Sequence, residues 1–597
     1  MVYKKKQKGL YLGGKQNKGM IYLNYKLFKN SLNDKDKLIE TVLLNRGIEN
    51  PEEYLSLDSS CINDYDNLDN MEEAVDCFAK HFENNDCISI LVDSDPDGFS
   101  SAAMLYSYIK MLEEDYPVRY ILHNNNKAHG LVKMEDGDFC IPDGTKLFIV
   151  PDAGTNDAEQ FNKLIDSGID CIVLDHHEAE DIAKSNKAII VNNQMSKNYT
   201  DKDFSGAGIA MEFLRALDDY YICDYADKFL DLCAFANISD VMDIRNSQTR
   251  YYIEEGIKNI KNKFLLALAK AQEFSTKGII NIHTISWYWT PILNSMIRIG
   301  SMEDRDLVFR AFIETDERFP YKKRGSDIEV DEDIYTRAAR LCKNIKAKQD
   351  KMRDALYNEL KDEINPDDKV VVLVVNGADS GIVGLSCMKL CDFASKPTIV
   401  LQEYKDGALG GSARNYDGSP VKDFKELVNS VGLFNFAQGH SGAFGCDIDK
   451  DKLEDAKKAL NEALNHIEYD DTIYVDFIFS PYDLDADFFQ TLDKNQWVWG
   501  HGVSEPLVAV EGVEVSTDEI AIMGKDKNSI SFFADSVKYC KFKLPQDDEL
   551  LQLANEAIGE NIKLNVVGEC SINDYGGKRI AQMIINDYEV VDKEEEL

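Results

Sequence analysis

The chain has 597 residues, with 106 acidic side chains against 67 lysines and arginines, so its formal net charge is −39. At roughly 150 residues per domain, this length predicts about four domains. A hydrophobic content of 44% is enough for several cores and excludes a chain that is disordered throughout. The sequence contains no run of about 18 apolar residues, which excludes a membrane-spanning helix.

The charge and the cysteines indicate the surroundings in which the chain works. The thirteen cysteines stand singly and form no CxxC pair, so we expect reduced thiols in a cytoplasmic protein. The basic segment 1–30 has no apolar stretch behind it, which argues against a secretory signal. The net charge argues against simple electrostatic binding of nucleic acid. It leaves two interpretations open: solubility, or carboxylates clustered to hold divalent cations.

The first part of the chain predicts helices and then a parallel sheet. Residues 36–80 read as helical, and from about residue 86 short apolar runs alternate with amphipathic segments. Such alternation is typical of a parallel sheet covered by helices. Buried strands are expected at 87–92, 146–150 and 171–174, with a helix over 101–112. Ligands of such sheets bind beyond the carboxyl ends of the strands.

The second half of the chain predicts a long helix, another α/β unit and a β-rich end. Residues 331–366 read as one helix that ends before Pro366, with a basic patch between Arg337 and Arg353. That patch is either a solvated face or a path for phosphates. A second α/β unit starts at 370–375 and runs to about 467. Short strands follow, which predict a small barrel, at 472–479, 507–515, 529–533, 537–544 and 562–567.

Three acids follow the first predicted strand at a spacing of two, namely Asp93, Asp95 and Asp97, and Gly98 comes directly after them. Alternate residues of a turning segment can converge on one point, and neighbouring carboxylates are unfavourable without a cation. A calcium-binding EF-hand loop begins in the same way. It needs a glutamate at position twelve, where this chain has Met104, so we disfavour that alternative.

Three further segments place acids or histidines after predicted elements: Asp152, the triplet Asp175-His176-His177, and Asp240. Each is weak alone, because an aspartate after a strand is commonly a helix cap. We expect all of them at strand ends of one sheet. Acids and a histidine gathered there predict two metal ions that share a bridging carboxylate.

In this order the motifs resemble those of the DHH phosphoesterases, and among them the RecJ single-strand-specific exonucleases. The resemblance covers nearly the whole chain. Beyond the four acidic motifs, it extends to segments 44–48 (LNRGI), 205–208 (SGAG), 291–298, 410–415 (GGSARN), 439–445 (GHSGAFG) and 499–506.

The resemblance implies an α/β fold in five parts. These are an N-terminal segment (1–75), a DHH domain with a parallel sheet (76–330), a long connector helix (331–366), a DHH-associated α/β domain that binds substrate (367–468), and a C-terminal OB-type β-barrel with an acidic tail (469–597). Base stacking in the barrel would fall to aromatic residues, for which the candidates are Trp497, Trp499, Phe532, Phe533 and Tyr539.

It also implies an activity: a metal-dependent 5′–3′ exonuclease that releases mononucleotides from single-stranded DNA in recombination, repair or replication. Two Mn²⁺ or Mg²⁺ ions would be held by Asp95, Asp97, Asp152, His176 and Asp240, with Asp152 bridging. Beside them, catalytic support is expected from His177, Asp175 and Asp93. Substrate phosphate would be bound by Arg414, His440, Ser412, Gly439, Asn294 and Arg298.

Two departures from the family pattern keep alternatives open. Leu91 and Asp379 stand where related sequences often have histidines. One alternative is a phosphodiesterase of small oligonucleotides or cyclic dinucleotides, which the barrel and connector helix disfavour. The other is a catalytically degenerate replication or repair scaffold, which the complete acid set disfavours. We further expect a monomer without membrane association, with single-stranded DNA as partner and a single-strand-binding protein or helicase as candidate partners.

Overall fold

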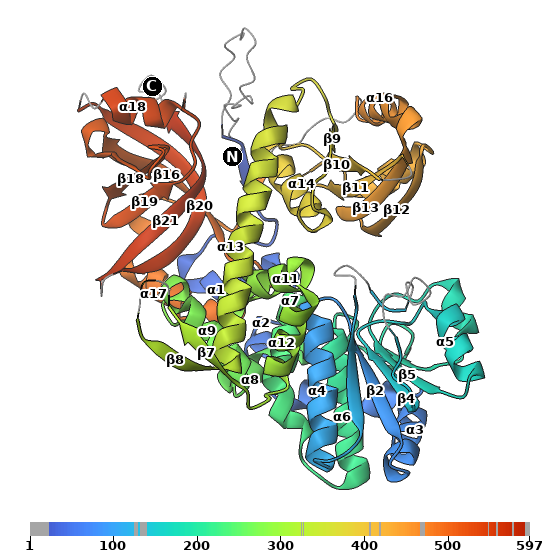
Figure 1. Cartoon of the computed structure of the whole chain (residues 1–597). Helices are drawn as coiled ribbons and strands as arrows, with labels where there is room; N and C mark the ends of the chain where they lie inside the picture. The colour runs from blue at the N-terminus through green and yellow to red at the C-terminus, as the bar shows by residue number, and fades with distance from the viewer. Residues whose placement is uncertain are drawn as a thin grey trace. The chain divides into compact units, whose positions relative to one another are not determined.

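The computed structural model describes residues 23–124, 129–131, 140–323, 325, 327–404, 407–416, 419–465, 472–546, 548–556, 559–575 and 578–591 (Figure 1). The chain forms two compact units. Unit 1 comprises Met1–Leu55, Arg353–Trp499 and Ser504–Leu597, and unit 2 comprises Ser56–Met352 and Gly500–Val503. Within the described residues, every helix is too short or too polar to cross a lipid bilayer. The acidic tail predicted after residue 591 lies outside them.

Unit 2 is built on a five-stranded parallel sheet in the order β3-β2-β4-β5-β6. Its strands are β2 (Cys87–Val92), β3 (Val118–Leu122), β4 (Thr145–Pro151), β5 (Asp170–Asp175) and β6 (Ile189–Asn192). The three strands predicted from apolar runs, β2, β4 and β5, are confirmed to within one residue at each end. Their mainly apolar sequences fit a sheet that helices cover on both faces.

Side chains of this sheet alternate between its two faces. Leu91, Phe148 and Val173 share a buried cluster with Phe161 and Leu164 of α5 (Ala158–Asp166). On the other face lie α4 (Pro96–Leu112) and α6 (Gly206–Tyr221), which pack against each other (Figure 1). Leu91, one of the two departures noted in the sequence, is therefore an ordinary core residue.

The helix after β2 begins earlier than the sequence predicted. α4 starts at Pro96 rather than Ser101, because the Asp95 carboxylate caps it by accepting a hydrogen bond from the Gly98 N–H at 2.8 Å. Proline suits the first helical position, where its missing N–H is not needed. Asp95 and Asp97 thus belong to a rigid helix start and not to a loop.

Unit 2 is completed by a set of helices and one hairpin. The helices are α3 (Met71–Glu83), α7 (Leu230–Ser239), α8 (Ser247–Lys258), α9 (Lys263–Thr276), α10 (Ile282–Thr284), a π-helical turn (Ile285–Trp289), α11 (Thr290–Ile299) and α12 (Met302–Phe312). The hairpin pairs β7 (Arg318–Lys322) with β8 (Glu329–Asp333).

The long helix α13 spans Ile334–Leu360, so the prediction of 331–366 was too long at both ends. Its first predicted residues belong to β8, and a short 3₁₀ turn, Lys361–Glu363, follows it. Much of its basic patch is neutralised locally. Arg340 forms a two-bond contact with Glu332 (2.6 and 3.0 Å), and Lys346 pairs with Asp350. The patch is therefore less available to phosphates than its sequence suggests.

Unit 1 contains the second α/β sheet, ordered β12-β13-β11-β10-β9. Its strands are β9 (Val371–Val375), β10 (Thr398–Glu403), β11 (Ala408–Arg414), β12 (Phe434–His440) and β13 (Ala443–Asp449). The helices are α14 (Ser380–Ala394), α15 (Phe424–Ser430) and α16 (Leu453–Ala463). A core of buried apolar residues, among them Ile399, Phe424 and Leu460, joins the sheet to α15 and α16.

The C-terminal part of unit 1 is a seven-stranded sheet ordered β15-β16-β20-β21-β19-β18-β17. Its strands are β15 (Phe477–Phe479), β16 (Leu507–Ser516), β17 (Ala521–Met523), β18 (Ser529–Ala534), β19 (Val537–Lys541), β20 (Asn561–Tyr575) and β21 (Lys578–Val591), with α17 (Ala486–Lys494) and α18 (Glu549–Glu556) beside them. The strong β-character is confirmed, but the described strands show no pairing that closes β15 onto β17. The sequence analysis also missed β21, because its polar residues obscure the alternation of apolar and polar side chains that is typical of a strand.

Residues 23–55 pack onto this C-terminal part. β1 (Tyr25–Leu27) pairs in parallel with β14 (Ile473–Val475), and α1 (Leu38–Asn45) and α2 (Pro51–Leu55) follow. Tyr25 is fully buried in a cluster with Val475 and Val567. Of the proposed stacking aromatics, only Trp497 and Phe533 are exposed; Trp499, Phe532 and Tyr539 are core residues.

Candidate metal centre and phosphate-binding residues

Three strands of unit 2 deliver an aspartate to the same edge of the sheet. Asp93 and Asp152 directly follow β2 and β4, and Asp175 is the last residue of β5. The backbone turns sharply at Asp152, whose φ of 63° lies in the left-handed region. Because parallel strands end at a common edge, residues distant in sequence become neighbours there.

Asp97 is held in place by the start of another helix. Its two carboxylate oxygens accept hydrogen bonds from the backbone N–H groups of Gly206 (2.7 Å) and Ala207 (2.9 Å). These N–H groups open α6, which Ser205 caps, as the SGAG segment predicted. Gly206 has to be glycine, since a Cβ there would lie 2.5 Å from the Cα of Asp152.

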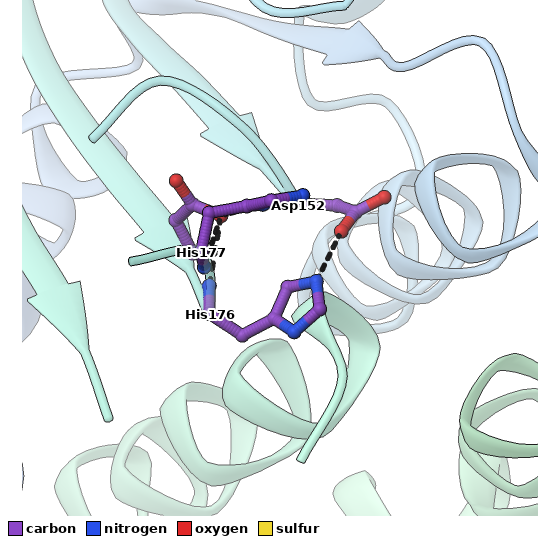
Figure 2. A group of neighbouring side chains, drawn as sticks. Asp152, His176 and His177 are labelled. Carbon is purple, nitrogen blue, oxygen red and sulfur yellow. Dashed lines mark hydrogen bonds and ion pairs between the residues drawn. The ribbon is translucent and has the colours of Figure 1, made fainter. Parts of the chain in front are cut away.

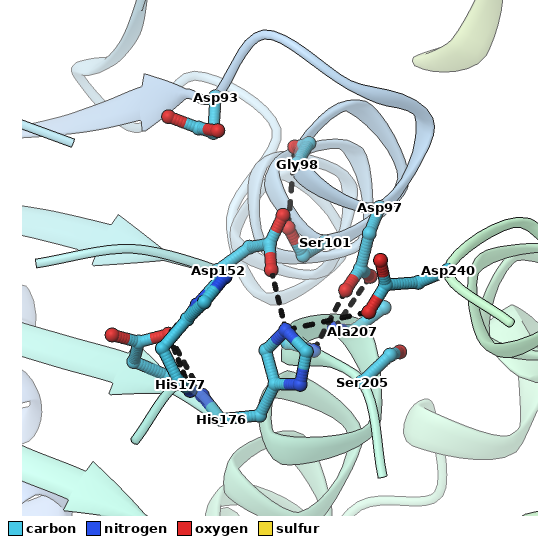
Figure 3. A network of polar contacts seen from close by, with 12 residues as sticks. Asp93, Asp97, Gly98, Ser101, Asp152, His176, His177, Ser205, Ala207 and Asp240 are labelled. Atoms are coloured by element: carbon cyan, nitrogen blue, oxygen red, sulfur yellow. Dashed lines mark hydrogen bonds and ion pairs between the residues drawn. The ribbon is translucent and has the colours of Figure 1, made fainter. Parts of the chain in front are cut away.

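Asp240 reaches the site from a helix, so its prediction as a strand-end residue was wrong. It is the C-cap of α7, and its carboxylate lies 3.5 Å from Nε2 of His176. The same Nε2 lies 3.3 Å from Oδ1 of Asp152 (Figure 2), so His176 stands between Asp152 and Asp240 (Figure 3). The sequence placed the residue correctly in the cluster but not its element.

The acids and histidines form overlapping groups of metal-ligand type. In one group, Asp93, Asp95 and Asp152 each place a carboxylate oxygen within 4.8 Å of the others. In another, carboxylate oxygens of Asp97 and Asp240 and a ring nitrogen of His176 lie equally close together (Figure 3). Asp152 and His176 also share a group with Asp175 and His177. All five residues predicted as metal ligands therefore lie together.

The charges of this cluster need a cation. Burial, followed by repulsion from Asp97, Asp95 and Asp240, raises the pKa of Asp152 well above its usual value. Burial and neighbouring acids raise the pKa of Asp95 and of Asp240 in the same way. Oδ2 of Asp152 is buried and has no hydrogen-bond partner among the described residues. A hard divalent cation bound by these oxygens would remove both penalties, so the residues fit Mn²⁺ or Mg²⁺.

His176 is suited to be a neutral ligand. Burial, together with the positive charge of His177, lowers its pKa to about 4, so the imidazole carries no charge at neutral pH. A neutral ring nitrogen has the lone pair that metal coordination requires.

Asp175 orients the second histidine of the triplet. Its Oδ1 accepts hydrogen bonds from Nδ1 of His177 (2.8 Å) and from the backbone N–H of His176 (2.8 Å), and its Oδ2 accepts one from the Thr155 N–H (3.0 Å). Burial opposes the charge of Asp175, but these bonds and the charge of His177 lower its pKa. Nε2 of His177 is left to act on a ligand.

Two histidines beside Asp93 were not found from the sequence. Nδ1 of His129 lies 2.8 Å from the Asp93 carboxylate, and the buried His123 lies 3.6 Å from it. Asp93 raises the pKa of His129. His123 directly follows β3, a strand that the sequence analysis did not predict. Because site residues were sought only after predicted strands, His123 was not considered.

The residues expected to bind phosphate lie mostly in unit 1, at one end of its α/β sheet. Ala443 of β13 pairs with Arg414 of β11 on one side and with His440 of β12 on the other. Residues in one row across a sheet share a face, so Arg414 and His440 lie two strands, or about 10 Å, apart. Gly439 has a φ of 129°, and Ser412 and Arg414 both approach Gly384 of α14 so closely that a Cβ there would collide.

The remaining predicted residues lie on other helices. Asn294 and Arg298 lie one turn apart on α11. Asp379 is the N-cap of α14, where it accepts a hydrogen bond from the Gly381 N–H at 2.8 Å. Its negative charge thus has a structural use at a helix start.

Comparison with known proteins agrees with this arrangement. The model of the DHH family, N-terminal domain, matches residues 87–236, and the RecJ OB domain model matches residues 475–587. The SPbeta prophage-derived protein YorK of Bacillus subtilis (strain 168), provisionally named a single-strand DNA-specific exonuclease, is 36% identical over 563 residues, which are 93% of this chain and 96% of YorK. The single-stranded-DNA-specific exonuclease RecJ of the same organism is 24% identical over 92% of this chain and 67% of its own length.

A solved structure shares the fold across both units. The crystal structure of RecJ in complex with Mn²⁺ from Thermus thermophilus matches with a TM-score of 0.71 at 18% identity, covering 94% of this chain and 79% of that one. At this identity the match shows the fold. Together with the identity to YorK and the two matching domain models, it shows that the chain belongs to the DHH family, among its RecJ-like exonucleases.

Proposed function

We propose that this protein is a metal-dependent exonuclease that degrades single-stranded DNA from the 5′ end to mononucleotides, in recombination, repair or replication. The observation that carries the proposal is the pair of overlapping ligand groups around Asp152 and His176. Paired acids that are buried, mutually repelling and partly unpartnered serve little purpose in a scaffold. The RecJ relatives are named for single-stranded DNA, which supports that substrate.

The residues of the cluster divide into metal ligands and supporting side chains. Asp95, Asp97, Asp152, His176 and Asp240 would hold two Mn²⁺ or Mg²⁺ ions. When bound, such ions supply an activated water and neutralise charge on the scissile phosphate. Asp175 fixes His177 so that its free Nε2–H can donate to a phosphate oxygen. Asp93 positions His129 beside them.

Unit 1 would bind the nucleic acid. Arg414 and His440 face one side of the sheet and suit the oxygens of a phosphate, and Ser412 and Gly439 lie beside them. Asn294 and Arg298 would contact the strand from α11. In the RecJ-type OB part, the exposed Trp497 and Phe533 are the stacking candidates that remain. We expect the protein to act as a cytoplasmic monomer, with a single-strand-binding protein or helicase as partner.

Digestion of end-labelled single-stranded DNA with Mn²⁺ tests the proposal. The wild type should release labelled mononucleotides at once from a 5′-labelled strand and only late from a 3′-labelled one. Asp152→Asn should release none, and Asp166→Asn should behave as wild type, because Asp166 is an exposed acid of α5 paired with Lys187.

Other outcomes select the alternatives. Cleavage of dinucleotides but not of long strands would replace the proposal by a small-nucleotide phosphodiesterase. Failure on both substrates, with no Mn²⁺-dependent rise in the unfolding midpoint, would leave the scaffold.

A further inference from the structure

The opposite edge of the unit 2 sheet carries a second cluster of ligand-type side chains. It lies at the amino ends of the strands, since Asp170 is the first residue of β5 and Asp86 immediately precedes β2. Helix α3 adds Cys77 and His81, which are four residues apart and so project from the same helix face. Because the strands are parallel, this edge is the one remote from the Asp152 centre.

His81 is the centre of this cluster. Only 5% of the residue is exposed, and its ring is held from both sides: Nδ1 lies 2.8 Å from Asp86 and Nε2 lies 2.9 Å from Asp170. One ligand atom from each of Cys77, His81 and Asp170 lies within 4.8 Å of the other two. The Cys77 thiol makes no hydrogen bond to any part of the chain that the structure describes.

This geometry matches a transition-metal site in two respects. Sulfur, imidazole nitrogen and carboxylate oxygen are together the ligand set of zinc and not of Mg²⁺ or Mn²⁺. In metal sites the ligating histidine usually donates its other N–H to a carboxylate, and Asp86 is placed to accept it from Nδ1. With zinc bonds of about 2.0–2.3 Å, ligand atoms lie about 3.5 Å apart. A pair of atoms at the 4.8 Å limit would have to close by about 1.3 Å, and Nε2 of His81 and the Asp170 oxygen, now 2.9 Å apart, would have to open by about 0.6 Å.

We propose that Cys77, His81 and Asp170 form a zinc-binding site, oriented by Asp86, that ties α3 to the amino edge of the sheet. The site is separate from the proposed catalytic centre. A water would complete a tetrahedral set.

Lys80 would compete with the metal for the Asp170 carboxylate. Its ammonium lies 2.8 Å from the same Asp170 oxygen that faces His81. Without metal, Lys80 and a doubly hydrogen-bonded His81 can balance Asp86 and Asp170 as an ionic network. Metal binding must displace the ammonium, which is exposed and free to move into solvent.

Cobalt titration of the full-length protein, freed of metal with chelator, tests the site. Thiolate ligation to Co²⁺ gives a charge-transfer absorption in the near ultraviolet, and the groups around Asp152 contain no cysteine among the described residues. The wild type should develop this band as Co²⁺ is added, and zinc should abolish it. Cys77→Ser should lose it, while Cys87→Ser, a partly buried thiol outside every ligand group, should keep it.

Two further variants separate a metal site from an ionic network. Asp86→Asn should weaken cobalt binding about 10–100-fold, as loss of an orienting carboxylate does. Lys80→Met should tighten it, because the competing cation is gone. No band in the wild type, or a band that survives Cys77→Ser, would overturn the proposal. So would a folded Lys80→Met variant, with normal circular dichroism, that binds cobalt no more tightly than the wild type.

Discussion

At the scale of single residues, Asp152 combines three unfavourable features. It has a left-handed backbone, it is almost fully buried, and burial and four neighbouring acids raise its pKa. Strain and uncompensated charge of this kind persist where a ligand relieves them. Metal-free protein should therefore be less stable than its contacts suggest, and metal should restore the difference.

Asp152→Asn should change the unfolding midpoint in opposite directions without and with metal. Without metal the variant should unfold at a higher temperature than wild type, because one of the repelling charges is gone. The midpoint should move about 2–4 °C for each kcal/mol in a unit of this size. With Mn²⁺ the order should reverse, since the variant lacks the bridging ligand. Thermal unfolding with chelator and with Mn²⁺ measures both midpoints. If Mn²⁺ raises the midpoint of the variant as much as that of the wild type, Asp152 is not the bridging ligand.

Glu212 is a second buried acid, on α6 but outside the metal groups. Burial raises its pKa to about 7, against the opposing charge of Arg215 and hydrogen bonds from Tyr252 and Gln248. Its folded pKa thus exceeds the unfolded value of 4.5. Folding favours the protonated form, so the stability that it contributes is full below pH 4.5 and is lost as the pH rises through 7.

Glu212→Gln should remove this pH dependence, because the amide is neutral at every pH and can still accept the bond from Tyr252. Relative to the variant, wild type should lose up to about 3 kcal/mol of unfolding free energy between pH 4.5 and 8, for a pKa that moves from 4.5 to about 7. Urea unfolding at several pH values, with chelator present, measures the difference. Parallel pH profiles of the two proteins would show that Glu212 is already ionised below pH 7.

At the scale of elements, the start of α6 holds the metal centre together. Its N–H groups bind Asp97 of α4, and its Gly206 closely approaches Asp152, which follows β4, so one helix end fixes two acids that come from different elements. Backbone N–H groups at a helix start also carry the positive end of the helix dipole, which suits a carboxylate. The position of this helix therefore sets the distance between the two acids.

Gly206→Ala should damage the centre more than the fold. The new Cβ would lie 2.5 Å from the Cα of Asp152, so the helix or the turn must move. We expect at least a tenfold loss of nuclease activity, equal to about 1.4 kcal/mol, with a weaker Mn²⁺-dependent rise in midpoint. Ala216→Gly, inside the same helix, is the control: it should cost about 1 kcal/mol of stability and leave activity intact. Equal activity of both variants would show that the contact is not needed.

The elements also show how far the sequence alone could lead. Buried strands such as β2 and β5 were predictable, because a short apolar run bounded by acids is typical of a strand in a covered parallel sheet. The residues of the acid–histidine cluster were predictable from motif order, and the structure brings them together. Asp240 was misplaced because Ile238-Ser239-Asp240 reads as a strand end, and only tertiary packing shows the C-terminus of α7 there. His129 lies in a segment without periodicity, where no pattern marks a residue that contacts Asp93.

At the scale of the whole molecule, residues 23–55 and the C-terminal sheet form one structure from distant parts of the chain. Arg46 binds the Asp476 carboxylate with both of its terminal nitrogens, at 2.8 and 2.9 Å. Asp476 is fully buried and also accepts bonds from Asn45 (2.8 Å) and from the Leu507 N–H (2.9 Å). The LNRGI segment recognised in the sequence thus has a structural role: it supplies the partners of one buried charge.

Removing Arg46 should loosen unit 1 and leave the metal centre of unit 2 intact. Arg46→Met leaves a buried carboxylate without its charged partner, which should lower the free energy of unfolding by about 3–5 kcal/mol. The double variant, Arg46→Met with Asp476→Leu, removes both charges and should recover most of that loss. Limited proteolysis should cut residues 472–591 faster in the single variant than in wild type or the double variant. The Mn²⁺-dependent rise in the midpoint of unit 2 should persist in all three, because its ligands lie elsewhere in the chain.

If the single variant resists protease as wild type does, water must reach Asp476 and the pair does not hold residues 23–55 in place. If the double variant is as sensitive as the single one, the bonds from Asn45 and the Leu507 N–H depend on the carboxylate itself, and the charge is what organises this junction.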